Sequence, residues 1–112
     1  VVAEGYRLNV PPRVVPLAGA GGRAPREHSF FSVDNPNVFV EVVKRAERDD
    51  ALIVRLYEAH NTRGPVTLAT SLPVRQAWVA DLMEDPLQPV DVARGEIRLQ
   101  VKPFEIVTLC LK

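Results

Sequence analysis

The chain has 112 residues, of which 46% are hydrophobic and 25% are charged, so it is long enough for one packed core and too apolar for a disordered segment. Fourteen basic residues balance fourteen acidic ones without any long block of like charge, which argues against a nucleic-acid-binding protein. No apolar run is long enough for a membrane helix. We therefore predict a single folded domain over residues 1–112 that binds neither nucleic acid nor membrane.

The single cysteine and the start of the chain suggest where the protein belongs. Cys110 has no second cysteine to pair with, which favours the cytoplasm over a secreted scaffold held by disulfides. The chain begins at Val1 without a methionine or a signal peptide. We expect it to be a piece of a longer polypeptide.

Ten prolines are spread along the chain and leave little room for long helices. Between them lie short segments rich in Val, Ile, Leu, Phe and Tyr, a pattern typical of an antiparallel sandwich or barrel. We predict an all-β fold, an antiparallel two-sheet β-sandwich of the immunoglobulin-like or jelly-roll-like kind. The predicted strands cover residues 4–10, 30–33, 38–44, 51–58, 65–70, 74–82, 88–92, 96–101 and 105–111.

Residues 16–28, with the sequence PLAGAGGRAPREH, interrupt this pattern. They offer few side chains to bury, and we predict a long Gly/Pro-rich loop. Residues 19–24 match a Gly-x-Gly-x-x-Ala nucleotide fingerprint, but no helix is predicted to follow them. We interpret the match as accidental.

Two apolar runs flank the charged sequence KRAERDD and predict a β-hairpin. Alternation places Val38, Val40 and Val42 on one face of its first strand. The charges of the turn are expected to be solvated rather than catalytic. Arg55 differs, because it lies among apolar residues and a charge in such a strand usually needs a partner. The candidate partners are the carboxylates of Glu41, Glu47 and Glu58. Alternatively, Arg55 points toward a surface that meets another domain.

No catalytic or metal-binding constellation is evident. The sequence shows no paired carboxylates at a readable spacing, no set of metal ligands and no activated nucleophile, and Cys110 lies in an apolar strand. We therefore predict no catalytic residue, no metal ligand and no cofactor in this chain. Trp78 is a candidate for stacking on a sugar ring, although a buried structural tryptophan is the commoner role.

Several segments, taken in order, resemble a known family. They are FFSVDNPNVFVEVVKRAERDDALIVRLYEAHNTRGPVTLAT, then DLMEDPLQPV, and the closing VKPFEIVTLCL. The most specific parts are residues 37–47, residues 52–58 with Arg55, Tyr57 and Glu58, and residues 103–106. Together they resemble the C-terminal β-sandwich domain of family 38 glycoside hydrolases, the α-mannosidases, over roughly residues 6–111.

The resemblance implies a parent enzyme that is a zinc-dependent α-mannosidase working with retention, with its zinc and catalytic carboxylates in another domain. This chain would be a C-terminal, non-catalytic fragment that packs against the catalytic domain of the same polypeptide, shapes the rim of its cleft or aids assembly. Lys44, Arg55 and Glu58 are the candidate residues for an internal, interdomain or cleft-rim role. The alternative is a carbohydrate-binding module or interaction domain that binds a mannose-containing glycan through Trp78. The sequence leaves room for a homo-oligomer.

Overall fold

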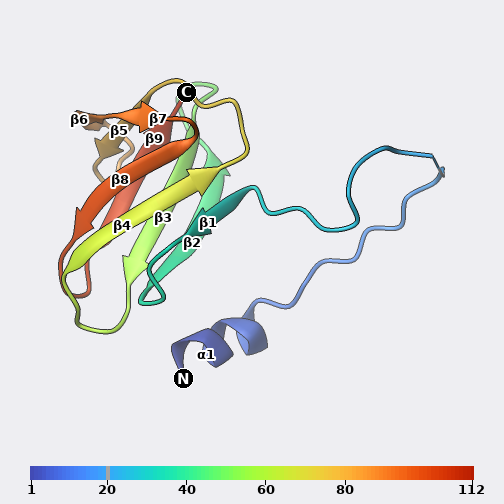
Figure 1. The fold of residues 1–112 in the computed structure, drawn as a ribbon, viewed down its shortest axis with the longest axis horizontal. Helices are drawn as coiled ribbons and strands as arrows, with labels where there is room; N and C mark the ends of the chain where they lie inside the picture. Colours follow the sequence, from blue (N-terminus) through green and yellow to red (C-terminus); the bar gives the residue numbers. More distant parts are fainter. Residues whose placement is uncertain (20) are drawn as a thin grey trace.

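The protein is a β-sandwich. The computed structural model describes residues 1–19 and 21–112, and it places two antiparallel sheets face to face (Figure 1). The four-stranded sheet has the order β1-β4-β8-β7, and the five-stranded sheet has the order β2-β3-β9-β5-β6. The predicted fold is therefore confirmed.

The strands of the two sheets interleave along the chain. The four-stranded sheet contains β1 (Phe31–Val33), β4 (Gly64–Thr70), β7 (Val92–Ala93) and β8 (Glu96–Val101). The five-stranded sheet contains β2 (Val38–Arg45), β3 (Leu52–Glu58), β5 (Ala77–Ala80), β6 (Pro86–Val90) and β9 (Ile106–Leu111).

The core fills the space between the sheets. Strand β8 shows the predicted alternation, because Ile97 and Val101 are buried while Arg98 and Gln100 are exposed. Gly95 forms the turn before it with φ 79°, and a Cβ there would lie 2.6 Å from the carbonyl oxygen of Thr70. Only glycine fits this position without strain. The buried core residues are Val38, Val54, Leu56, Val66, Leu68, Ala77, Ile97, Val101, Val107, Leu109 and Leu111.

The predicted hairpin is confirmed, but the prediction that Val42 lies on the same face as Val38 and Val40 is wrong. Strands β2 and β3 pair with Val40 opposite Leu56 on the inner face. The register then shifts, and Val42 lies opposite Arg55 on the outer face. A β-bulge at Glu41 supplies the extra residue and reverses the alternation beyond it.

The predicted strand over residues 4–10 is wrong, because Val2–Asn9 form the short helix α1. The helix buries none of its own residues, but the ring of Tyr6 lies 5.5 Å from that of Phe39 on β2, and the Tyr6 hydroxyl donates to Glu41. The described residues between α1 and β1 form no helix or strand and make a long excursion away from the sandwich (Figure 1). The segment returns to the sandwich at His28, whose Nε2 lies 2.9 Å from Ser71 Oγ, and at Phe30, whose carbonyl oxygen accepts the Thr70 hydroxyl. Within the described ranges, no helix has both the length and the apolar character that crossing a bilayer demands.

Two other predicted strands differ from the structure. The segment 74–82 contributes only β5, because the carboxylate of Asp81 accepts the N–H groups of Met83 and Asp85 and starts a turn. The segment 88–92 is divided between β6 and β7, since the chain crosses from one sheet to the other at Asp91.

Candidate functional site

The outer face of the five-stranded sheet carries a groove beside Arg55. Its volume is about 370 Å³, and we call it the outer groove. Strands β2, β3 and β9, helix α1 and the loop after β5 all contribute to it. Its lining residues are Tyr6, Glu41, Val42, Arg55, Tyr57, Leu82 and Ile106.

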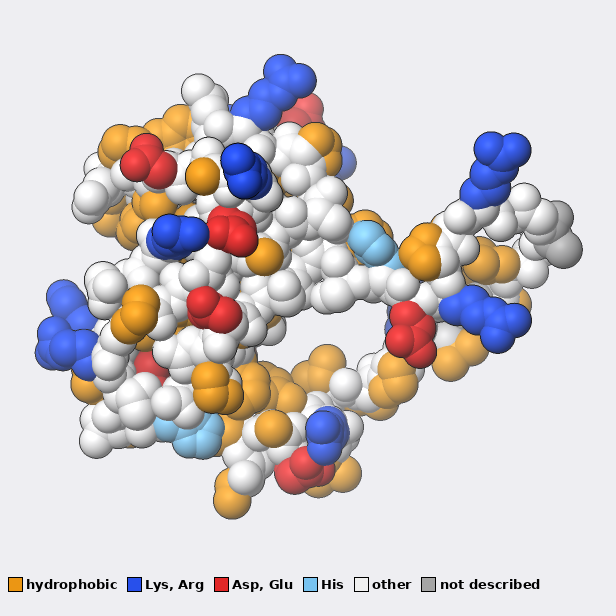
Figure 2. Space-filling view, in the orientation of Figure 1, with side chains coloured by type: hydrophobic (Ala, Val, Ile, Leu, Met, Phe, Trp, Pro, Cys, Tyr) orange, Lys and Arg blue, Asp and Glu red, His pale blue; other side chains and the backbone are white. Residues whose placement is uncertain are grey.

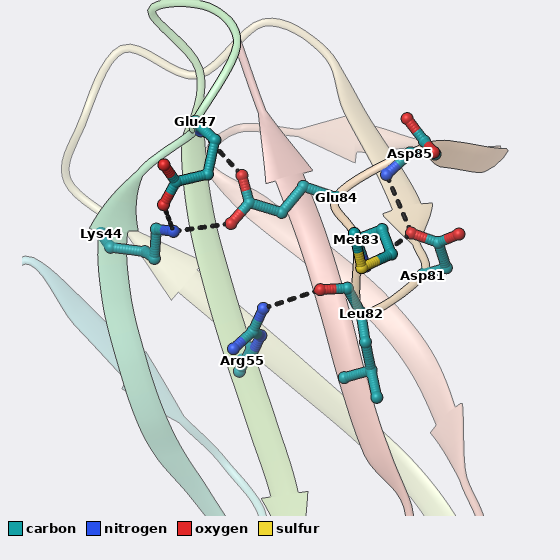
Figure 3. A network of polar contacts seen from close by, with 8 residues as sticks. All are labelled: Lys44, Glu47, Arg55, Asp81, Leu82, Met83, Glu84 and Asp85. Atoms are coloured by element: carbon teal, nitrogen blue, oxygen red, sulfur yellow. Dashed lines mark hydrogen bonds and ion pairs between the residues drawn. The ribbon is translucent and has the colours of Figure 1, made fainter.

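Arg55 is partly buried in this groove and is incompletely bonded. Its Nη2 donates to the carbonyl oxygen of Leu82 at 3.2 Å, while its Nε is buried without a hydrogen-bond acceptor (Figure 3). No carboxylate in the described ranges lies within ion-pair distance of its guanidinium group. A buried N–H without an acceptor is costly. The guanidinium group of Arg55 is therefore only partly hydrogen-bonded by the described residues.

The prediction that Arg55 bonds to Glu41, Glu47 or Glu58 is wrong for this structure. Glu41 accepts the hydroxyl of Tyr6, and Glu47 pairs with Lys44. Glu58 lies on the opposite face of β3, where alternation along the strand directs it toward the inner side. The second alternative, that Arg55 points toward another domain, stays a prediction.

Lys44 belongs to a separate, completed network on the same face. Its Nζ pairs with Glu47 and lies 2.7 Å from Glu84 Oε1, and the N–H of Glu47 donates to Glu84 Oε2 at 2.8 Å (Figure 3). The hydrogen bonds to Glu47 and Glu84 raise the pKa of Lys44, and that from Lys44 lowers the pKa of Glu84. Lys44 and Arg55 thus share a face but no common partner.

The charges of the β2–β3 turn are exposed, as predicted, but they also form ion pairs that the sequence analysis missed. Arg48 pairs with Asp85, and Asp49 pairs with Lys112 at 2.5 Å. Glu84 itself has φ 70°, a conformation that non-glycine residues rarely adopt. The turn is therefore clamped to the loop at residues 81–85 and to the end of the chain. The sequence signal for these contacts is limited to the acidic residues of the segment DLMEDP, which could pair with the basic residues of the turn.

Glu58 is an internal residue of this domain. Its side chain is fully buried at the end of β3. Oε1 accepts the N–H groups of His60 and Thr62 and the Thr62 hydroxyl, and Oε2 accepts the N–H of Phe104 at 2.8 Å. Burial opposes its ionisation, but the bonds from Phe104, Thr62 and His60 together lower its pKa to about 2. Its carboxylate is fully engaged within the chain.

The two loops that Glu58 holds both contain strained backbone. Asn61 has φ 58° and Phe104 has φ 55°. For a bulky side chain such as phenylalanine this conformation is unfavourable and persists only when surrounding bonds enforce it. Glu58 supplies those bonds from one carboxylate, which is a structural role that its place in a strand did not reveal.

Trp78 lies on the outer face of the five-stranded sheet and is half-buried. It packs against a small cluster that includes Ile53 and Cys110, and the Nζ of Lys112 lies 5.8 Å from the centre of its ring. This is a cation–π distance. Stacking of Trp78 on a sugar ring stays a prediction.

The donors of this domain do not suit a zinc ion. In the part of the chain that the structure describes, no three His, Cys, Asp or Glu side chains are grouped closely enough to hold a metal. Cys110 is buried, which raises the pKa of its thiol and keeps it protonated at neutral pH.

A family model and two related proteins agree on the family of this chain. Residues 37–109 match the glycosyl hydrolases family 38 C-terminal beta sandwich domain. The chain is 38% identical to alpha-mannosidase 2C1 of Mus musculus and 37% identical to alpha-mannosidase 2C1 of Homo sapiens, in each case over 99% of this chain. It spans only 11% of the length of either relative. The chain belongs to the C-terminal β-sandwich domains of the family 38 glycoside hydrolases.

Proposed function

We propose that this domain is a non-catalytic part of a zinc-dependent, retaining α-mannosidase, and that it packs against the catalytic domain of the same polypeptide through the outer groove. The zinc and the catalytic carboxylates would belong to that other domain. A cytoplasmic location is part of the proposal, supported by the unpaired, buried thiol of Cys110.

The observation that carries the proposal is the incompletely bonded guanidinium group of Arg55, in a groove that Val42, Leu82 and Ile106 also line and in which Glu41 is already engaged by Tyr6. Its Nε has no acceptor within the domain. Beside it, Leu82 and Ile106 are 66% and 54% exposed. Exposed apolar side chains around a partly buried arginine are typical of a surface that another protein surface covers.

The occupant that fits best is another part of the same polypeptide. The two mannosidase relatives are about nine times as long as this chain, because it spans only 11% of them. A domain within a longer chain has its neighbours at a high effective concentration, so even a small surface of this kind can stay engaged. A carboxylate or carbonyl oxygen of the catalytic domain would complete the bonding of Arg55.

The test compares two leucines of matched exposure in the full-length parent enzyme. Leu82 lies in the outer groove and is 66% exposed, whereas Leu87 on β6 lies outside the groove and is 67% exposed. Leu82→Asp should lower both the melting temperature and the activity on an aryl α-mannoside, since a carboxylate would enter a covered apolar surface.

Leu87→Asp is the control and should leave both quantities unchanged. Equal effects of the two substitutions would argue against packing through the outer groove. A parent that hydrolyses no α-mannoside would refute the proposed enzyme itself, whatever the two variants do.

A further inference from the structure

A second hollow lies on the side of the sandwich, away from the outer groove. It has a volume of about 720 Å³ and opens between β6 of the five-stranded sheet and β8 of the four-stranded sheet. We call it the side cleft. Neither Lys44, Arg55 nor Glu58 lines the side cleft.

The topology explains why the sandwich is open here. Strand β7 pairs with β8 only at Ile97 and Glu96, so the rest of β8 has no neighbour on this edge. Strand β6 is the outermost strand of the other sheet. The chain crosses between the sheets at Asp91, and the two short edge strands leave a gap beside the crossing.

The polar side chains of the side cleft are of mixed kind and are largely free. Across the described ranges, Gln88, Asp91 and Gln100 make no side-chain hydrogen bond or ion pair, while Arg98 contacts Glu96 at 3.3 Å. Each glutamine amide can both donate and accept. The cleft thus presents several solvent-exposed donors and acceptors, and the partly buried Val79 and Leu99 are also among its lining residues.

These groups select against several classes of ligand. One guanidinium group and two carboxylates line the cleft, and Figure 2, in which the four-stranded sheet faces the viewer, shows basic and acidic side chains interspersed over that face. A polyanion would therefore find no concentrated positive field. A purely apolar ligand would leave the amides and carboxylates without partners.

We propose that the side cleft binds a neutral, polyhydroxylated ligand, namely a mannose unit of an oligosaccharide substrate. Neighbouring sugar hydroxyls both donate and accept, which suits the amides of Gln88 and Gln100 and the carboxylate of Asp91. The C–H face of the sugar contacts Val79 and Leu99. The volume lies within the range of small-molecule pockets. The choice of mannose rests on the proposed function.

The test uses the full-length parent enzyme with the double substitution Gln88→Ala and Gln100→Ala. The value of kcat/KM is measured for a mannose oligosaccharide and for an aryl α-mannoside, which has a single sugar unit and so no second mannose to place in the side cleft. We expect about a tenfold loss on the oligosaccharide, which corresponds to about 1.4 kcal/mol, and a change below about twofold on the aryl mannoside.

The matched control is Gln76→Ala, which removes an exposed glutamine outside the side cleft. It should leave the ratio of the two kcat/KM values unchanged. An unchanged ratio in the double variant overturns the inference, and so does an equal loss on both substrates, which would indicate a packing role.

Accessibility gives a second measurement. Gln100→Cys in the intact parent should react with a maleimide, detected by mass spectrometry of the labelled peptide. Protection of this cysteine would show that another part of the polypeptide covers the cleft, and it would overturn the inference. A parent with normal mannosidase activity and a Leu82→Asp effect, but an unchanged substrate ratio, would refute the sugar subsite alone.

Discussion

Strand β3 carries Glu58 on the inner face of the five-stranded sheet and Arg55 on its outer face. The two charged side chains differ in how completely their polar atoms are hydrogen-bonded. On the inner face, Glu58 is fully buried and accepts four hydrogen bonds from its own chain. On the outer face, Arg55 makes one hydrogen bond and keeps a buried Nε without an acceptor. A folded domain satisfies nearly all of its buried polar groups. The inner face is therefore complete in itself, whereas the outer face keeps a buried donor that no described residue of the chain satisfies.

The outer faces of the two sheets also differ in the polarity of their side chains. On β8 the outward positions carry Arg98 and Gln100, which suit contact with water. On the five-stranded sheet the outward positions include Ile53, which is fully buried in a cluster with Ala51, Ala80 and Cys110, and the exposed Ile106. The outward positions of β8 are polar, whereas the outer face of the five-stranded sheet combines apolar side chains with the charged Lys44 and Arg55. This mixed character is consistent with the proposed packing of that face against another domain.

The largest effect is expected from Glu58→Ala. The change leaves the N–H groups of His60, Thr62 and Phe104 without their acceptor and releases two strained loops. We expect the melting temperature of the purified chain to fall by at least about 8 °C at pH 7. Circular dichroism during heating measures it.

Glu27→Ala provides the control, since Glu27 is exposed in the loop before β1. Its melting temperature should match that of the unchanged chain. A loss for Glu58→Ala no greater than for Glu27→Ala would contradict the structural role of Glu58.

The lowered pKa of Glu58 should also make the stability of the folded chain depend on pH in the acid range. Folding lowers the pKa of Glu58 from its ordinary 4.5 to about 2, so its contribution to stability is fully present above pH 4.5 and is lost as the pH falls toward 2. We expect the difference in melting temperature between the unchanged chain and Glu58→Gln to shrink across that window. A difference that is constant from pH 7 to pH 2 would speak against a lowered pKa in the folded state.

A moderate effect is expected from Glu84→Gln on the completed part of the outer face. Glu84 has 7% of its side chain exposed and links Lys44 to the N–H of Glu47. Loss of its charge should lower the melting temperature by about 2 to 4 °C. Asp85→Asn, which breaks the more exposed pair with Arg48, should change it by less than about 2 °C. Equal losses would mean that the partial burial of Glu84 adds nothing.

The sequence was sufficient for the β2–β3 hairpin and for β8, because their apolar residues alternate and their turns are marked by Asp and Gly. It was insufficient where a distant contact or a single extra residue decides the outcome. Residues 4–10 were predicted as a strand, yet residues 4–9 belong to α1, whose Tyr6 contacts Phe39 and Glu41 of β2. The bulge at Glu41 left no mark in a run of apolar residues.

The partners of the candidate site residues were also beyond the sequence. The sequence indicated Arg55 as a charged residue within an apolar strand. It did not indicate that Tyr6 binds Glu41 or that Lys44 binds Glu47, which leaves neither carboxylate for Arg55. Glu58 could be identified as a polar strand end, but the loops that it holds come from residues 60–62 and 104. These pairings depend on the three-dimensional arrangement of loops, which composition and alternation do not encode.

The smallest effect in the isolated chain is expected from Arg55→Met, and this substitution tests the comparison most directly. No ion pair is broken, and the loss of one hydrogen bond to Leu82 is offset by removal of the unsatisfied Nε. The free energy of unfolding should therefore change by no more than about 0.5 kcal/mol, as measured by urea denaturation of the purified chain. If the proposed packing through the outer groove is right, the same substitution should lower the melting temperature of the full-length parent, because an oxygen of the catalytic domain would lose its partner. A loss of about 3 to 5 kcal/mol in the isolated chain would instead reveal an internal ion pair. No effect in either protein would mean that Arg55 is an ordinary strand residue, and the outer face would then need no partner to explain it.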